Sequence, residues 1–216
     1  FPVQFVNRPN LNFRGYCGTL ASGILKPGDE VTVLPSGKES KVKALVTYDG
    51  DLDHAVPGEA ITVTLENEID VSRGDMLVHS NHHQPHVSSQ FKAMVVWMTE
   101  QPLVPNKQYS IKVGVNDAGG ALTGIDYQID VNTLEHNKAS ELKLNEIGLC
   151  EFSLNKPVVF DSYKRNRTTG AFIIIDRLTN VTIGAGMITD AVSSNHEVVA
   201  EGEFSAFEME LNALIR

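Results

Sequence analysis

Apolar and polar residues alternate with a period of two along much of this 216-residue chain. In the stretch AITVTLEN, Ile61, Val63 and Leu65 are apolar, and the residues between them are polar. Because successive side chains of a strand point to opposite faces, this pattern predicts a strand with one buried face. Two further stretches predict strands with four apolar residues on one face: Tyr109, Ile111, Val113 and Val115 in the first, and Ile125, Tyr127, Ile129 and Val131 in the second.

Closely spaced turn residues separate these strands, for example Pro27-Gly28-Asp29 and Arg73-Gly74-Asp75. Many short strands without a helical period are typical of an all-β fold of barrels or sandwiches. Residues 81–89 carry a proline and no apolar period, so we expect them to be a linker. The sequence therefore predicts one β-barrel over residues 1–80 and a second over 90–190.

The end of the chain has a different pattern. Residues 191–203 are mostly polar and predict a tether, whereas residues 204–216 repeat apolar positions with a helical period. Ser205 and Glu208 have the spacing of a capping box at the start of this segment. We therefore predict a short amphipathic C-terminal helix over 204–216.

Composition narrows the function classes. The chain has 18 Lys and Arg against 27 Asp and Glu, a formal charge of -9, which opposes broad binding to nucleic acid. No apolar run is long enough to span a bilayer. Cys17 and Cys150 both lie in apolar strand patterns, which indicates reduced core thiols in a cytoplasmic protein rather than a disulfide.

Motifs for nucleotide binding and catalysis are missing from this sequence. It contains no G-x-x-x-x-G-K-[ST] phosphate loop, and no G-x-S-x-G, H-E-x-x-H or C-x-x-C motif. We therefore assign no catalytic, cofactor-binding or metal-binding residue to this chain.

Two weaker metal motifs favour structural explanations. Four histidines in and next to the predicted linker could supply zinc or nickel ligands: His79, His82, His83 and His86. No cysteine or carboxylate lies among them, so a solvated linker is favoured. The sequence DGDLDH, residues 49–54, resembles the start of a calcium loop. A calcium loop needs glycine at the position of His54 and glutamate at that of Ala60, so a hairpin turn is favoured.

Two surfaces are candidates for partner contact. Arg165 and Arg167 lie in the basic stretch YKRNRTTGAF and could hold a carboxylate or phosphate of a partner, or could stay in water. Phe207 and Leu211 share one face of the predicted helix. That face could dock in a groove of another chain or domain, or pack on the chain's own barrels.

Several blocks of sequence carry a family resemblance. RGYCGTLASGILKPGDEVTVLPSG and AVPGEAITVTLENEIDVSRGDMLV resemble the second domain of translation-factor-type GTPases. More narrowly, the chain resembles the large, GTP-hydrolysing subunit of bacterial sulfate adenylyltransferase along its whole length. The blocks that carry this resemblance are FPVQFVNRPNLNFRGYCGT, IDVSRGDMLVH, IDVNTLE, LNEIG, NRTTGAFIIIDRLTN and FSAFEMELNALIR.

The resemblance implies a function for the parent protein. In this family, two barrels follow a GTPase domain that binds GTP and magnesium, and that domain is missing here. The resemblance further implies a small catalytic subunit that binds ATP and converts ATP and sulfate to adenosine 5′-phosphosulfate and pyrophosphate, coupled to GTP hydrolysis. We expect the two barrels to transmit the GTPase state and to dock the small subunit, with residues 1–16 joining the GTPase domain.

Two alternatives stay open at this point. The barrels could bind tRNA or protein in an elongation-factor-like GTPase, although the charge of -9 opposes tRNA binding. A self-contained β module for a carbohydrate or small ligand is the other alternative, although no aromatic-lined polar cluster is visible in the sequence. We expect no contact with nucleic acid or membrane.

Overall fold

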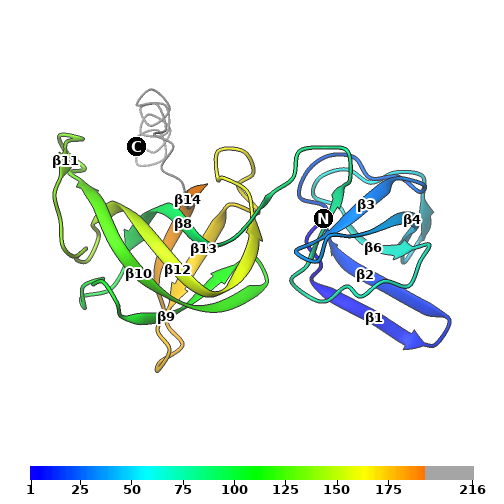
Figure 1. Cartoon of the computed structure of the whole chain (residues 1–216), viewed down its shortest axis with the longest axis horizontal. Helices are drawn as coiled ribbons and strands as arrows, with labels where there is room; N and C mark the ends of the chain where they lie inside the picture. The colour runs from blue at the N-terminus through cyan, green and yellow to red at the C-terminus, as the bar shows by residue number, and fades with distance from the viewer. Residues whose placement is uncertain (193–216) are drawn as a thin grey trace.

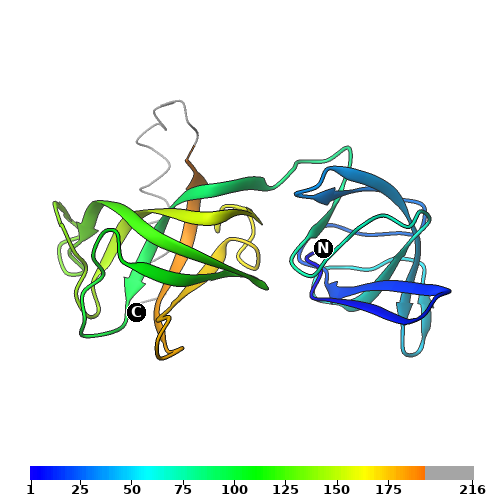
Figure 2. The same cartoon turned by 60° about the horizontal axis from the view of Figure 1, so that its bottom comes forward.

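The computed structural model describes residues 1–192, which form two β units side by side (Figure 1). We call residues 1–79 the first unit and residues 86–192 the second barrel. One linker segment, residues 80–85, connects them (Figure 2). Every regular element of residues 1–192 is a strand, so the all-β prediction is confirmed for this range. The predicted helix 204–216 and most of the predicted tether lie outside the described residues.

The first unit is a seven-stranded sheet in the order β1-β2-β6-β4-β3-β7, with β5 paired to β4. All neighbouring strands in it are antiparallel. The strands are β1 (Phe5–Asn10), β2 (Phe13–Thr19), β3 (Glu30–Leu34), β4 (Lys38–Thr47), β5 (Gly50–Leu52), β6 (Ala60–Leu65) and β7 (Met76–His79).

Residues 1–3 link the two ends of this sheet. The nitrogen of Phe1 donates to the carbonyl of Leu77 at 2.8 Å, and the amide of Leu77 donates back at 2.9 Å. Val3 likewise exchanges hydrogen bonds with the segment before β7, because its amide donates to Asp75 and its carbonyl accepts from Gly74. The chain then continues into β1, so this short segment joins the β7 edge to the β1 edge.

The core of the first unit is mainly aliphatic. Ile61 and Val63 of β6 are buried and Leu65 packs against the same cluster, as the alternation predicted. Other members come from most strands of the sheet and include Val31, Val33, Val42, Leu45 and Tyr16.

The second barrel closes on itself. Its strands pair in the order β10-β12-β8-β14-β13-β9, and β9 pairs again with β10, so no main strand is left with an unpaired edge. The short strand β11 pairs antiparallel with the last two residues of β10. The strands are β8 (His86–Trp97), β9 (Gln108–Val113), β10 (Asn116–Ile129), β11 (His136–Asn137), β12 (Ile147–Phe160), β13 (Ala171–Ile175) and β14 (Thr182–Ala191).

The interior of this barrel is rich in aromatic side chains. The ring of Phe91 lies 5.2–5.7 Å from the rings of Phe152, Phe160 and Phe172. Trp97 is fully buried, and its indole nitrogen donates to the carbonyl of Gln101 at 2.6 Å. A second, smaller apolar cluster lies on the opposite face of these strands and contains Met94, Ile129, Ile147 and Leu149.

The structure corrects three details of the sequence analysis. Residues 86–89, assigned to the linker, are the start of β8. The strand predicted through Val115 ends at Val113, because Gly114 takes a φ of 57° and turns the chain into β10. Finally, Ile125 and Tyr127 do not share a face. Ile125 pairs with Cys150 and Tyr127 with Leu149, so one extra residue in β10 moves the side chains that follow to the other face.

Candidate functional site

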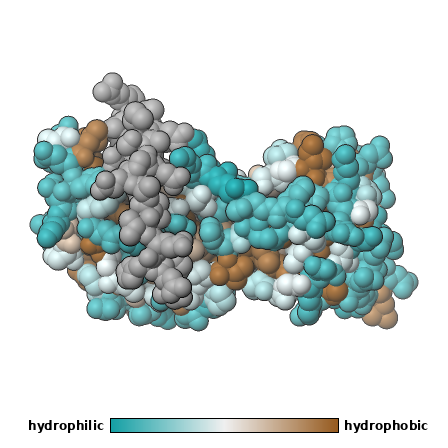
Figure 3. Space-filling view, turned by 45° about the horizontal axis from the view of Figure 1, so that its top comes forward, coloured by the Kyte–Doolittle hydropathy of each residue, from teal (hydrophilic) through white to brown (hydrophobic). Residues whose placement is uncertain are grey.

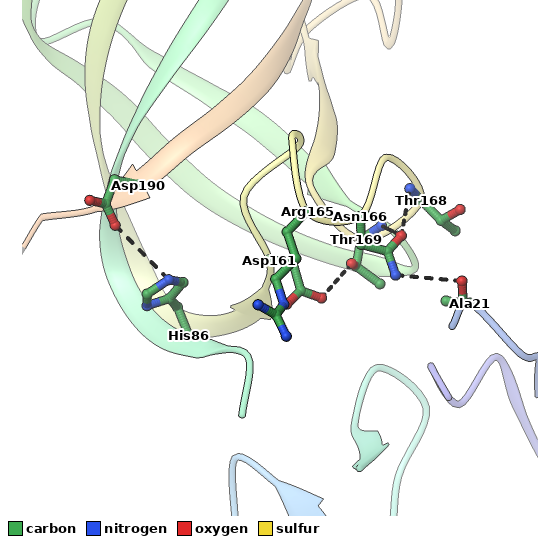
Figure 4. Close-up of polar contacts among 8 residues, drawn as sticks. All are labelled: Ala21, His86, Asp161, Arg165, Asn166, Thr168, Thr169 and Asp190. Atoms are coloured by element: carbon green, nitrogen blue, oxygen red, sulfur yellow. Dashed lines mark hydrogen bonds and ion pairs between the residues drawn. The ribbon is translucent and has the colours of Figure 1, made fainter. Parts of the chain in front are cut away.

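Loops, rather than strand faces, join the two units. One of these loops is residues 161–170 of the second barrel, which connect β12 to β13 and carry the predicted basic stretch. Figure 4 shows this loop approaching the segment of the first unit that contains Ala21. A second contact comes from the start of β10, beside the β9–β10 turn, so the junction is the site at which both units can be coupled.

The loop is ordered by its own polar side chains. Asp161 is buried and accepts a hydrogen bond of 2.7 Å from the hydroxyl of Thr169 (Figure 4). The side-chain oxygen of Asn166 accepts from the amides of Thr168 and Thr169, at 3.0 and 3.4 Å. Such side-chain to backbone bonds hold a turn in place of strand pairing. The loop is therefore a defined surface.

Both predicted basic residues have neighbours within this loop. The Nε atom of Arg165 lies 3.9 Å from Oδ1 of Asp161, and the Arg165 side chain is 54% exposed (Figure 4). The guanidinium of Arg167 lies over the ring of Tyr163, at 5.8 Å from its centroid. At such exposure an ion pair contributes little to stability. Arg165 nevertheless faces the junction, where its charge can act on the contact between the units.

Two side-chain amides cross the junction. Asn116 donates a 2.8 Å hydrogen bond from its Nδ2 to the carbonyl of Gly74. Asn166 donates a longer bond of 3.5 Å to the carbonyl of Ala21. Gly74 belongs to the Arg73-Gly74-Asp75 turn, and its φ of 98° together with the nearby Asn116 side chain favours glycine there. Burial raises the pKa of the Asp75 carboxyl in the same turn.

The histidines in and beside the linker have separate partners. Nε2 of His79 lies 2.9 Å from the carbonyl of Ile24 and 3.6 Å from the carboxylate of Asp29. His86 instead lies 3.9 Å from Asp190 on β14 (Figure 4). The rings of His79 and His82 are neighbours, with centroids 4.7 Å apart. Over residues 1–192, no three His, Cys, Asp or Glu side chains are grouped so that they could hold a metal ion.

A cleft of about 360 Å³ lies between the units. The first unit lines it with residues 20–25 and 76–79, and the second barrel with Asp161, Arg165, Asn166 and Thr169. Figure 3 shows a mostly hydrophilic surface with a hydrophobic patch beside the constriction between the units. The cleft combines apolar walls with a few polar groups, a composition suited to contact with another segment of protein.

Part of this site was predicted from the sequence. Arg165 and Arg167 lie on the junction loop, whereas Phe207 and Leu211 lie outside the described residues. Asn116 and Asn166, which make the crossing hydrogen bonds, were not predicted. The only available signal was the position of each asparagine beside a turn, and that signal does not reveal which turns meet in space.

Among residues 1–192, no helix has the length and apolar character needed to cross a membrane.

Two protein family models match different parts of the chain. Residues 16–78 match the family model of elongation factor Tu domain 2. Residues 90–189 match the model of the GTP-eEF1A C-terminal domain. The two matches fall on the first unit and the second barrel in turn.

The similarity to known proteins extends over the whole chain. Sulfate adenylyltransferase subunit 1 of Tolumonas auensis is 59% identical over 215 residues, which cover 100% of this chain and 45% of that protein. The chain is therefore similar over its full length to part of sulfate adenylyltransferase subunit 1. Subunit 1 of Saccharophagus degradans is 55% identical and that of Shewanella woodyi 56%, each over 216 residues and 45% of its length. The chain thus spans about half the length of these subunit 1 relatives.

Solved structures support the fold. A crystal structure of sup35 complexed with GDP matches with a TM-score of 0.79 and 15% sequence identity, covering 89% of this chain and 47% of sup35. The complex of sup35 with GMPPNP matches with a TM-score of 0.76 and 14% identity, over the same shares of both chains. At this identity the likeness concerns the fold, which is of the translation-factor type.

Proposed function

We propose that this chain is the non-catalytic pair of β units of a sulfate adenylyltransferase large subunit. In this proposal, the parent enzyme converts ATP and sulfate to adenosine 5′-phosphosulfate and pyrophosphate, coupled to GTP hydrolysis. GTP and magnesium bind to the GTPase domain of the parent, ATP binds to the small catalytic subunit, and the enzyme works in the cytoplasm. The observation that carries the proposal is the 59% identity to a subunit 1 relative over the whole chain.

The chemistry of the described residues supports a passive role for this part. The sequence has no phosphate loop of the G-x-x-x-x-G-K-[ST] type. A closed barrel pairs the backbone groups of its main strands internally, so it can move as one body when a neighbouring domain changes state. The two units therefore transmit a movement, and the junction sets how tightly they move together.

The small subunit is the proposed docking partner. The test is co-purification of the 216-residue chain with the small catalytic subunit of a subunit 1 relative, followed by calorimetric titration. We expect a complex at micromolar concentrations and neither GTP hydrolysis nor sulfate activation by this chain alone. Absence of binding at 100 μM would contradict docking, and GTP hydrolysis by the purified chain would contradict the passive role.

The junction loop is the part of the surface to test first. Reversing the charge in Arg165→Glu or Arg167→Glu, in the full-length large subunit, should weaken small-subunit binding about tenfold if the loop contacts the partner. Lys164→Glu makes the same change of charge in the same loop and serves as the matched control. Unchanged affinity and unchanged GTP-stimulated sulfate activation in both Arg variants would remove the loop from the docking surface.

A further inference from the structure

The outside of the second barrel carries two adjacent rows of apolar residues. Each row crosses five neighbouring strands, β10, β12, β8, β14 and β13, in direct register. The first row consists of Tyr127, Leu149, Met94, Met187 and Ala171. The second row consists of Ile129, Ile147, Val96, Ala185 and Ile173. We call these two rows the outer apolar face.

Strand alternation places these rows on the outside. Their neighbours along the strands belong to the barrel core, namely Ala93, Val95, Cys150, Phe172 and Ile188. Because successive side chains of a strand point to opposite faces, the outer apolar face points away from that core. Four of its residues form an apolar cluster of their own.

This face is unusual within the molecule. One step further along the strands, the outward row is charged, because Glu151 pairs with Lys92 and the Lys92 amine lies 2.6 Å from the Asp126 carboxylate. The first unit also has polar outward positions, such as Thr32 opposite Glu39. An apolar area of this extent, bounded by charge, marks a surface that another segment covers.

Part of the face is hollowed. A groove of about 530 Å³ lies over β13 and β14, and it is lined by Val96, Ala171, Ile173, Ala185 and Met187 of the outer apolar face. Tyr163, Lys112 and Thr168 form part of its wall. Such a groove can take the apolar side chains of an amphipathic segment, with Lys112 in reach of a carboxylate.

We infer that residues 204–216 of this chain occupy the outer apolar face. β14 ends at Ala191, four residues after Met187, so the chain leaves the barrel about 13 Å from the middle of the face. Residues 193–203 can span up to about 36 Å, which is ample for this return. The segment 204–216 repeats apolar residues at helical spacing and carries acidic residues between them. Its attachment to the same barrel favours it over a separate partner, because a tether raises its effective concentration.

Four of the five methionines of the chain offer a direct test. Met94 and Met187 lie on the outer apolar face, Met76 lies in the core of the first unit, and Met98 is 44% exposed. Peroxide converts an accessible methionine to its sulfoxide, which mass spectrometry can locate. In the 216-residue chain, Met94 and Met187 should oxidise about tenfold more slowly than Met98.

A double variant should detach the proposed covering segment while leaving the sequences of both β units unchanged. Phe207→Glu with Leu211→Glu should raise the oxidation rates of Met94 and Met187 about tenfold and leave those of Met98 and Met76 unchanged. The matched control, Glu208→Gln with Glu210→Gln, alters the same segment at polar positions and should leave all four rates unchanged. Far-ultraviolet circular dichroism checks that the sheets stay folded.

A variant of the face itself gives an independent readout. Leu149→Glu should release residues 193–216 and speed their cleavage by a glutamate-specific protease about tenfold, whereas Leu178→Glu, at an exposed position of the same barrel, should not. The inference is overturned if Met94 and Met187 oxidise as fast as Met98 in the unmodified chain, or if the Phe207 and Leu211 changes leave their rates unaltered. Protection that appears only when the small subunit is added would assign the face to that subunit and would also overturn it.

Discussion

The two units of this molecule close their sheets in different ways. In the second barrel, strand pairs run round the whole circumference, because β9 pairs with both β13 and β10. In the first unit, residues 1–3 form hydrogen bonds with β7 and the turn before it, and the chain then continues into β1. The second barrel therefore depends on its strands alone, whereas the seam of the first unit depends on a short segment outside the named strands.

The two units also differ in the side chains that fill their cores. Four phenylalanine rings meet in the second barrel, whereas the first unit relies mainly on valine, leucine and isoleucine. Aromatic side chains bury more surface than aliphatic ones, and their edge-to-face contacts add to the stability gained by burial. The comparison indicates that the second barrel is the rigid body and that the first unit is the more adaptable one.

The largest expected loss of stability follows from a cavity in the aromatic core. Phe91→Ala should lower the free energy of unfolding of the second barrel by about 3–5 kcal/mol, because it removes a ring that contacts three others. Trp97, the only tryptophan of the chain, reports this barrel in urea unfolding followed by fluorescence. The control Leu45→Ala, in the first unit, should not shift that transition. Equal shifts would show that the two units unfold together.

The two cysteines should differ strongly in reactivity. Burial raises the pKa of the Cys150 thiol to about 12, so at pH 8 its thiolate is about a thousandfold scarcer than that of an ordinary thiol. Cys17 of the first unit is only partly buried, with its sulfur 3.3 Å from the Thr62 hydroxyl. A thiol reagent at pH 8 should therefore label Cys17 long before Cys150. Rapid labelling of both in the native chain would contradict the rigid second barrel.

A glycine substitution tests the junction between the units. Gly74→Ala should destabilise the molecule by about 2–3 kcal/mol, because it strains a residue with a φ of 98° and collides with the Asn116 side chain. Gly28→Ala makes the same change at a φ of 90° with open space around it, so it should cost only about 1 kcal/mol. Thermal unfolding of both variants separates backbone strain from the contact across the junction.

The smallest effect concerns a hairpin of the second barrel. Hydrogen bonds from Thr179 and Leu178 lower the pKa of the Asp176 carboxyl. A lowered carboxyl pKa stabilises the folded state above the unfolded value of 3.8, and this stabilisation is lost as the pH falls through the folded pKa. Asp176→Asn should thus slightly lower the melting temperature at pH 7 and make no difference near pH 2. A difference that persists at pH 2 would indicate a role other than charge.

The sequence predicted the fold class well and the details of strands less well. The alternation at Ile61 and Val63 was correct, because no bulge interrupts that strand within the alternating stretch. The prediction for Ile125, Tyr127 and Ile129 was wrong, because an extra residue in β10 changes the face and alternation alone does not reveal it. Both cysteines are free, as predicted, but only Cys150 is buried in a core.

The candidate site was predictable only in part. The basic loop stood out through its composition, but its approach to Ala21, across 145 residues of sequence, depends on how two separately closed units meet. The same holds for Asn116 and Gly74. The outer apolar face shows this limit most clearly, because five strands from different parts of the chain contribute to it.

The order of apolar and polar residues by itself determined that this chain forms strands, where most turns fall, and which family it resembles, because these properties are local. The tertiary structure decided which strands close a barrel, which side chains the bulge turns outward, and which loops meet at the junction. These outcomes depend on strand register and on contacts between distant residues, whose energies appear only when the sheets are assembled.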